Sequence, residues 1–332
     1  MGSAVDTSGD HSRHETAGSV MSISPFYDDY PKDPAKNLQW RIRCRERALT
    51  DLHFRHALWD AAMEDVLFWM GAFCWSLEPR AMVKVRPFIP WAHQESVFIA
   101  MDKAIDDAAR EEKSIDVLVD KSRAQGGTFG YLWIDLRRWL RDPMFSAGYV
   151  TRNEALVDSA TDSDTLFWKL AWGINRLPFW MVPSGFDMKK HRSLSGHSLL
   201  NPANGATLVG YAAGQDVAAG GRKTVFTADE FGAKDFISGG KDESVMEALH
   251  DVSNQLRLVS ARYADSGVFH EACEDPDHSG IHLILDWKDN PIHAKNSYVV
   301  RDGRPGARKL EEQGAVNDYH GENPDLQHRY PS

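Results

Sequence analysis

Apolar side chains recur near helical spacing in the first quarter of the chain. They run through residues 37–80, and no proline interrupts this segment before Pro79. Such a series is typical of helices that bury one face against a core. The pattern therefore predicts a helical region over residues 37–80. The apolar residues that define it are Ala48, Leu49, Leu52, Leu58, Ala61, Ala62, Val66 and Trp69.

From about residue 90 the pattern changes to short apolar runs that alternate with helical stretches. This alternation is typical of a parallel sheet flanked by helices. It predicts an α/β fold with a mainly parallel central sheet and a helical N-terminal extension. The expected strands are Ile115–Val119, Gly148–Thr151, Thr207–Gly210, Val225–Ala228, Leu256–Ser260 and Ile281–Trp287. The expected helices are Thr128–Arg141, Asn153–Ile174 and Ser244–Gln255.

The polar ends of the chain set the expected boundaries. Residues 1–36 are predicted to be a disordered leader and residues 301–332 a linker or frayed tail. Between them we expect a helical N-terminal or lid segment at 37–89 and an α/β core at 90–300. The most apolar run, Val66–Trp75, is about half of the ~20 residues that cross a bilayer. No membrane or export segment is therefore expected.

Composition narrows the class of protein. The chain has 332 residues, of which 42% are hydrophobic and 26% charged, and this excludes a mainly disordered, collagen-like or disulfide-scaffold protein. The formal net charge of −10 argues against a surface that is basic all over, but a local basic patch can still bind nucleic acid. The three cysteines are odd in number and widely spaced, which suits a reducing, cytoplasmic compartment.

The most informative segment runs from Ile115 through residue 132. An apolar strand leads into a turn with Gly126 and Gly127, and a helix begins at Thr128. Backbone N–H groups and a helix N-terminus then point at one spot, which favours a bound polyphosphate. The usual phosphate loop has lysine immediately before the Ser/Thr, where this chain has glycine. Lys121, at the start of the loop, is the lysine that can reach the β- and γ-phosphates. Taken alone, the segment is equally compatible with an ordinary strand, turn and helix that do not form a phosphate site.

A second segment, Lys223–Phe231, adds a pair of acids. Asp229 and Glu230 follow an apolar strand, and the carboxyl ends of parallel strands form the crevice in which α/β sheets bind ligands. We expect Asp229, together with the Thr128 hydroxyl, to hold Mg²⁺, and Glu230 to act as general base on the attacking water. Alone, this segment is also compatible with a strand that ends in a solvated acidic turn.

These two segments, taken with four others, resemble the ATPase domain of the large subunit of the tailed-phage DNA-packaging terminase. The resemblance covers roughly residues 45–300, and its motifs occur in the order of the family. The matching segments are Pro90–Gln94, Lys121–Thr128, Tyr149–Asp158, Gly220–Glu230, Val259–Ala261 and Asp286–Pro291.

The resemblance implies a P-loop NTPase of the ASCE type that uses ATP and Mg²⁺ to move double-stranded DNA into a viral procapsid. It implies a portal protein and a small terminase subunit as partners, a homo-oligomeric ring, and a place in the host cytoplasm. By the same resemblance Gln94 reads the adenine, Ser122 belongs to the phosphate loop, and Ser260 with Ala261 couples hydrolysis to movement.

Two departures from the family pattern leave alternatives open. Members often carry a trans-acting arginine three residues before the position of Arg222, where this chain has Ala219, so Arg222 or Arg123 is expected to replace it. The family's nuclease domain is also missing, because the about 40 residues after Asp289 are too few for one. Either the chain is truncated or the nuclease lies on another chain. The rival functions are a DNA helicase or translocase outside packaging and a non-catalytic nucleotide-binding scaffold.

Several other groups of residues are expected to be structural. His270, Cys273, His278 and His282 have the residue types of a zinc site without a familiar spacing, and chance clustering is the favoured interpretation. Two basic runs are expected on solvated faces, with DNA contact as the alternative for the second. An aromatic group is expected in the core. The basic runs are Arg41–Arg47 and Arg137–Arg141, and the aromatic residues are Trp168, Trp172, Phe179 and Trp180.

Overall fold

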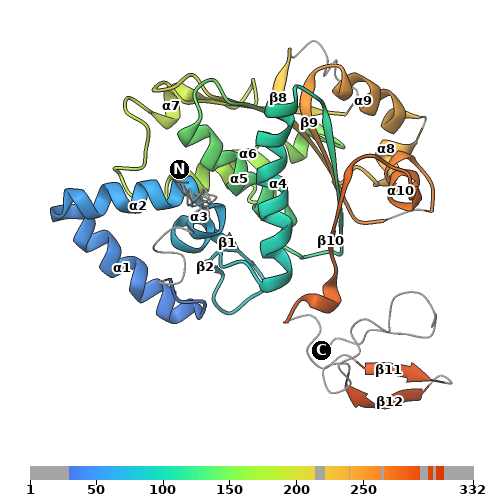
Figure 1. The fold of residues 1–332 in the computed structure, drawn as a ribbon, viewed down its shortest axis with the longest axis horizontal. Helices are drawn as coiled ribbons and strands as arrows, with labels where there is room; N and C mark the ends of the chain where they lie inside the picture. The colour runs from blue at the N-terminus through green and yellow to red at the C-terminus, as the bar shows by residue number, and fades with distance from the viewer. Residues whose placement is uncertain are drawn as a thin grey trace, which may run out of the picture.

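An eight-stranded mixed sheet forms the centre of the protein (Figure 1). The computed structural model describes residues 30–213, 221–238, 240–262 and 265–291, and the backbone of 298–301 and 304–309. The sheet has the order β10-β3-β9-β8-β4-β7-β6-β5. Its strands are β3 (Ile115–Lys121), β4 (Ser146–Thr151), β5 (Arg192–Ser193), β6 (Ser198–Leu200), β7 (Thr207–Ala212), β8 (Lys223–Asp229), β9 (Ser253–Ser260) and β10 (Ile281–Leu285).

Every pair of neighbours from β10 to β7 is parallel, and only β6 and β5 join antiparallel at one edge. The predicted mainly parallel sheet is therefore confirmed. Strand β9 lies between β3, which leads into the phosphate loop, and β8, which ends in the acidic pair. This order, with one strand between the two functional strands, is that of the ASCE-type P-loop NTPase fold predicted above.

Helices cover both faces of the sheet, as the alternation of side chains along β3 requires. Val117 and Val119 belong to the larger apolar cluster with α3 (Val66–Phe73), α4 (Ala92–Glu111), α5 (Gly127–Arg141) and α6 (Leu166–Ile174). Leu118, between them, faces a second cluster with α8 (Lys234–Ile237), α9 (Lys241–His250) and α10 (Val268–Glu274). In Figure 1 α4 crosses one face of the sheet, and α8–α10 gather at the side away from the N-terminal helices.

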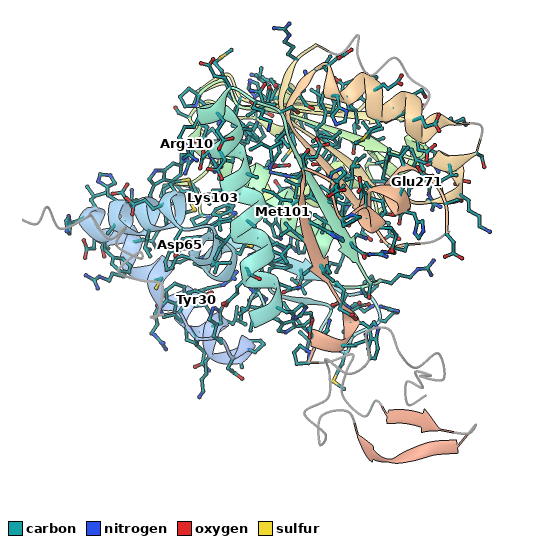
Figure 2. The ribbon with its side chains drawn as sticks, turned by 45° about the vertical axis from the view of Figure 1, so that its right-hand side comes forward. Tyr30, Asp65, Met101, Lys103, Arg110 and Glu271 are labelled. Carbon is teal, nitrogen blue, oxygen red and sulfur yellow. The ribbon has the colours of Figure 1, made fainter. Side chains whose placement is uncertain are left out.

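The N-terminal region is three helices and a hairpin instead of the continuous helical region predicted over 37–80. The helices are α1 (Pro34–Thr50), α2 (Leu52–Glu64) and α3, and the hairpin is β1 (Trp75–Leu77) with β2 (Val85–Pro87). Asp51 and Asp65 separate the helices, because each has an extended backbone and accepts hydrogen bonds from the first turn of the next helix. A capping aspartate inside an apolar series thus starts a new helix. Figure 2 labels Tyr30 and Asp65 on this side of the molecule and Glu271 on α10 at the other.

Three other boundaries differ from the prediction. The helix expected over 153–174 is a 3₁₀ turn at Glu154–Leu156 and α6 alone, because Ser159 and Asp162 accept hydrogen bonds from nearby backbone N–H groups and favour turns. Helix α9 ends at His250, five residues before the expected end, and Ser253 already pairs in β9. Strand β10 ends at Leu285, and Trp287–Asp289 form a 3₁₀ turn.

Both basic runs contain buried arginines, so the expectation that they lie on solvated faces is wrong for these residues. Arg41 is 2% exposed and donates to the carbonyls of Gly71 and Cys74 at the end of α3. Arg137 and Arg138 are 1% and 2% exposed and pair with Asp102 on α4. A guanidinium has five donors, and these positions supply the acceptors that allow its burial. The aromatic group was predicted correctly except for Phe179, which is 67% exposed.

Parts of the predicted organisation lie outside the described residues. The leader falls there up to residue 29, while Tyr30 is buried and α1 begins at Pro34. The tail falls there apart from the backbone of Arg301, which ends β11 (Tyr298–Arg301), and of β12 (Arg304–Lys309), which pairs with β11. The remaining short helix is α7 (Met188–His191). None of the helices in the described part of the chain is both long enough and apolar enough to span a membrane.

Candidate active site

The ends of two strands that are distant in sequence meet at one edge of the sheet. Thr128, in the first turn of α5, donates from Oγ1 to Oδ2 of Asp229 at 3.2 Å. Asp229 is the last residue of β8, and β3 runs parallel to it with β9 between them, so both strands end at the same edge. The sheet therefore places a hydroxyl, a carboxylate and the N-terminus of a fifteen-residue helix around one point.

Lys121 lies against Gly127, the residue that stands where the usual loop has its lysine. A Cβ atom at Gly127 would lie 2.9 Å from Cδ of Lys121, closer than such atoms approach in proteins. Glycine at this position therefore leaves the space through which the lysine stem passes. No salt bridge joins Lys121 to a carboxylate within the described ranges, and the residue lines an open pocket of about 650 Å³.

Buried amides hold the phosphate loop from two sides. Gln94 is 2% exposed; its Nε2 donates to the carbonyl of Gln125 at 2.7 Å, and its Oε1 accepts from the Trp91 N–H at 2.8 Å. Asn290, beyond β10, donates to Oε1 of Gln125 at 3.0 Å. Gly126 has φ 70°, a left-handed conformation that suits glycine. These hydrogen bonds hold the loop in its turned shape, and both polar atoms of the Gln94 side chain take part in them.

Ser122 and Ser260, the two serines expected at the site, both bridge neighbouring segments. The Ser122 hydroxyl accepts from the Trp287 N–H at 3.2 Å, which ties the start of the loop to the end of β10. Ser260 is fully buried, and its hydroxyl accepts from the Gly232 N–H at 2.9 Å and donates to the Ala261 carbonyl. Ser260 therefore connects the end of β9 to the backbone two residues after Glu230.

Asp229 is oriented by more groups than the sequence indicated. Tyr131 donates to the same Oδ2 atom at 3.0 Å, and the Glu230 N–H donates to Oδ1 at 3.1 Å. Burial raises the pKa of Tyr131 well above its ordinary value, and the Asp229 carboxylate raises it further, so the phenol stays a donor. Tyr131 lies one helical turn after Thr128, and this spacing on α5 is the signal that could have identified it.

Glu230 projects into the pocket from a left-handed backbone position, φ 58°. Its Oε2 lies 3.3 Å from Nε of Arg152, and the two side chains are 36% and 38% exposed. Arg152 follows β4, so a third parallel strand end contributes to the site. Arg152 lies in the Tyr149–Asp158 segment of the resemblance and was not expected at the site, although its place after an expected strand was the available signal. The pocket is lined by Lys121, Arg123, Ala124, Arg152, Glu230, Ala233, Lys234 and Asp235.

The two candidate substitutes for the trans-acting arginine lie in different places. Arg123 lines the pocket beside Lys121. Arg222 is exposed and precedes β8, and the seven residues of that strand separate it from the site by roughly 20 Å at ~3.3 Å per residue. Arg222 therefore lies where β8 begins, at the opposite end of the strand from the site. Ala219 and Gly220, on which the family comparison also depended, lie outside the described residues.

The oxygen atoms of Thr128 and Asp229 fit a hard divalent cation. Mg²⁺ takes oxygen ligands at about 2.1 Å in an octahedron, so neighbouring ligand atoms lie about 3 Å apart. The 3.2 Å between the Thr128 hydroxyl and the Asp229 carboxylate is close to this separation. A magnesium ion bound by the hydroxyl, with Asp229 as a direct or water-mediated partner, therefore requires little rearrangement.

Comparisons with known proteins give structural matches alone. No protein-family model matches the sequence, and a search of curated proteins finds no match. The large terminase of bacteriophage HK97 matches with 16% identity and a TM-score of 0.47 over 80% of this chain and 49% of its own. The ATPase domain of the Thermus phage P74-26 large terminase, an arginine-to-alanine mutant, matches with 12% identity and a TM-score of 0.35 over 53% of this chain and 78% of its own.

This chain thus spans about half of the HK97 protein's length. Because both overlaps are partial, the fold assignment rests on the strand order and the site geometry described above. Both matched structures are of phage large terminases.

Proposed function

We propose that this chain binds ATP with Mg²⁺ at the ends of β3 and β8 and hydrolyses its terminal phosphoanhydride. The observation that carries the proposal is the hydrogen bond between Thr128 and Asp229, which joins the phosphate loop to the acidic strand end at 3.2 Å. Lys121, which lies against Gly127 and lines a pocket together with Glu230, supplies the positive charge that a triphosphate needs.

Each residue has a role that its position supports. The backbone N–H groups at Gly126 and Gly127 face the phosphates at the positive end of α5, and Lys121 neutralises the transferring group. Thr128 and Asp229 hold Mg²⁺, which supplies charge neutralisation between the phosphate oxygens. Glu230 orients the attacking water and accepts its proton. Arg152, paired with Glu230, positions that carboxylate.

We further propose that hydrolysis drives a motor that moves double-stranded DNA into a viral procapsid. The support is the ordered set of terminase-like motifs in the sequence, of which the described parts lie in or beside the same α/β sheet. In this proposal the portal protein and a small terminase subunit are partners in the host cytoplasm. Copies of the chain form a ring, in which Arg222 acts on a neighbour's nucleotide because it cannot reach its own.

The direct test compares the pocket acid Glu230 with an exposed acid outside the pocket. In Glu230→Gln, ATP turnover falls by about 100- to 10,000-fold while ATP still binds, because the general base is lost and the phosphate contacts remain. Glu247 is exposed on α9 and does not line the pocket, so Glu247→Gln is the matched control that retains turnover. Normal turnover in Glu230→Gln contradicts its role. A wild-type chain that binds ATP without hydrolysing it, even when assembled with portal and small subunit, indicates the scaffold alternative. ATP-driven strand separation indicates a helicase.

A further inference from the structure

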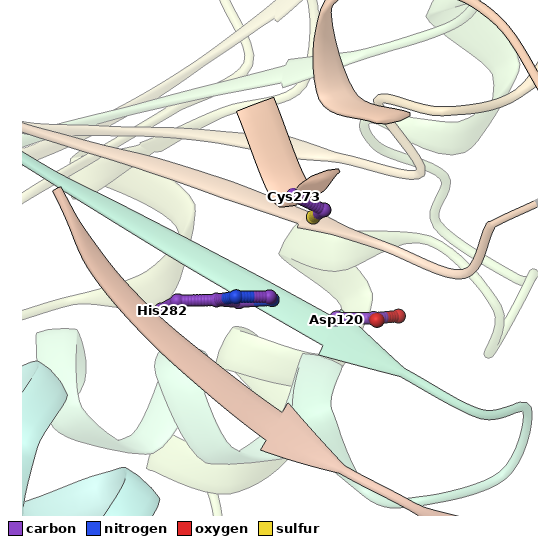
Figure 3. Close-up of side chains that lie close together, drawn as sticks. All are labelled: Asp120, Cys273 and His282. Carbon is purple, nitrogen blue, oxygen red and sulfur yellow. The ribbon is translucent and has the colours of Figure 1, made fainter. Parts of the chain in front are cut away.

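Three side chains of types that can bind a metal meet on the face of the sheet covered by α8–α10. Asp120 of β3, Cys273 of α10 and His282 of β10 each offer a ligand atom, and these atoms lie within 4.8 Å of one another (Figure 3). The register of the sheet explains part of this arrangement. His282 pairs with Leu118 in the parallel β10–β3 ladder, so His282 and Asp120 project to the same face. Helix α10 packs on β3 from that side and brings Cys273 close to both.

This cluster is different from the one that the sequence pattern suggested. Of the four residues with zinc-site chemistry, the structure brings Cys273 and His282 together. His278 instead accepts a hydrogen bond from the Gly280 N–H at its Nδ1, at 3.0 Å. Asp120, distant in sequence, completes the group. The spacing between His270 and His282 could not reveal it, because the third ligand comes from another part of the chain.

We propose that Asp120, Cys273 and His282 form a site for Zn²⁺. One thiolate, one imidazole and one carboxylate are a ligand set that Zn²⁺ takes, with water in the fourth position. A tetrahedral zinc ion holds ligand atoms roughly 3.5 Å apart, so small side-chain rotations close the observed group around an ion. His282 is exposed and the other two ligands are half-buried, which gives the metal a route from solvent.

The charges around the group are compatible with a divalent cation. Arg262 donates from Nε to Oδ2 of Asp120 at 2.7 Å and pairs through Nη1 with Glu274. The Arg262–Glu274 pair is neutral by itself, and Asp120 keeps a second oxygen for the metal. The ionised carboxylate and the thiolate balance the two charges of zinc, and the thiol proton is released to solvent on binding. Arg262 thus has the place of an outer partner that orients a ligating carboxylate.

The test uses the full chain without nucleotide, so its result is independent of the proposed ATPase activity. Co²⁺ is added as a spectroscopic probe and then displaced with Zn²⁺. We expect one equivalent of Co²⁺ with a thiolate charge-transfer band and tetrahedral visible bands, both removed by Zn²⁺. The chain has 14 histidines, so the thiolate band, rather than metal binding itself, identifies this site.

Matched variants assign the ligands. The thiolate band is lost in Cys273→Ser and kept in Cys44→Ser, a change at another half-buried cysteine. Zn²⁺ affinity falls at least about tenfold in His282→Ala, the effect expected even of outer-shell partners, and stays unchanged in His278→Ala. His282 is exposed, so this variant tests the site even where Cys273→Ser fails to fold. Absence of the band in the wild-type chain, or unchanged Zn²⁺ affinity in His282→Ala, would overturn the proposal.

Discussion

Two groups of charged residues differ in their exposure to solvent, and this difference distinguishes charges that stabilise the fold from charges that a ligand can reach. The first group lines the phosphate-loop pocket, the cavity that contains Lys121, Arg152 and Glu230 in its wall. The buried arginine network consists of Arg137, Arg138 and their carboxylate partners on α4. Both contain guanidinium groups beside carboxylates, but the pocket pair is more than one-third exposed and the network arginines are 1–2% exposed.

The buried arginine network joins the N-terminal helices to the α/β core. Arg137 forms two hydrogen bonds with Asp102 at 2.9–3.0 Å and donates to the carbonyls of Ala62 and Met63 in the last turn of α2. Burial opposes ionisation of Asp102, but Arg137 and Arg138 outweigh it and hold the pKa of that carboxyl below its ordinary value. In the pocket, Glu230 and Arg152 instead face a cavity that a ligand can enter.

The largest expected effect on stability comes from breaking the network. Arg137→Ala leaves Asp102 buried with one partner fewer and removes the hydrogen bonds to the carbonyls in the last turn of α2. The free energy of unfolding should therefore fall by about 3–5 kcal/mol. Urea denaturation measures this change. Arg110→Ala, which breaks an exposed pair with Asp107, is the control and should hardly change the free energy of unfolding. Equal losses in the two variants would contradict the contrast between buried and exposed pairs.

The ion pair between Arg137 and Asp102 also predicts how the stability of the fold depends on pH. Because the folded pKa of Asp102 is depressed, its contribution is complete above the unfolded value of about 3.9 and is lost as the pH falls through the folded pKa. The wild-type chain should therefore lose more stability below about pH 4 than Arg137→Ala, in which Asp102 has already lost one of its two arginine partners. Denaturation curves at several pH values measure the difference.

The next largest effect concerns the pocket. Lys121→Ala should lower ATP turnover by about 100- to 1000-fold and weaken ATP binding, because a preorganised charge at the phosphates is lost. Its stability should change by less than about 0.5 kcal/mol, unlike that of the network variant. Lys234→Ala removes another cation that lines the same cavity and should retain activity. Unaffected turnover in Lys121→Ala would assign the phosphate charge to another residue.

Local patterns predicted the parts of the fold that depend on short segments. The strands β3, β4, β7, β8 and β9 and the helix α5 lie close to their expected positions, because apolar runs bounded by turn residues are encoded locally. The meeting of Thr128 and Asp229 followed from one rule, that parallel strands end at a common edge. The breaks at Asp51 and Asp65 were missed because the apolar series continues through them.

Contacts between distant segments could not be predicted in the same way. Arg137 and Arg138 have the local appearance of a solvated run, and their burial depends on Asp102 on a helix for which the sequence analysis had no expectation. Arg152 meets Glu230 because β4 and β8 are neighbours, which only the strand order reveals. A charged residue's surroundings are a tertiary property, and local sequence carries little information about them.

A smaller effect is expected at the ion pair inside the pocket. Arg152→Gln should lower ATP turnover by about 10- to 100-fold with little change in ATP affinity, because Glu230 loses the partner that orients it. The half-exposed pair contributes at most about 1 kcal/mol to folding, so stability should hardly change. Arg152→Lys keeps the charge and should restore part of the turnover. A loss of affinity equal to the loss of turnover would instead place Arg152 on the nucleotide itself.

The smallest effect tests why glycine stands before Thr128. In Gly127→Ala the new methyl group meets Cδ of Lys121 at 2.9 Å, and the flexible lysine stem must move aside. The backbone at Gly127 does not have a positive φ, so the fold should tolerate alanine. We expect ATP affinity and turnover to fall by up to about tenfold, because the ammonium group leaves its place at the phosphates.

A double-mutant cycle separates displacement of the lysine from a general disturbance of the loop. If Gly127→Ala acts by moving Lys121, it has no further effect on turnover once Lys121 is already alanine, and the two losses are not additive. Additive losses would show that the methyl group obstructs the nucleotide directly. Non-additive losses would explain why glycine replaces the usual lysine at position 127. Lys121 enters from the start of the loop, and its stem requires the space that a side chain at this position would fill.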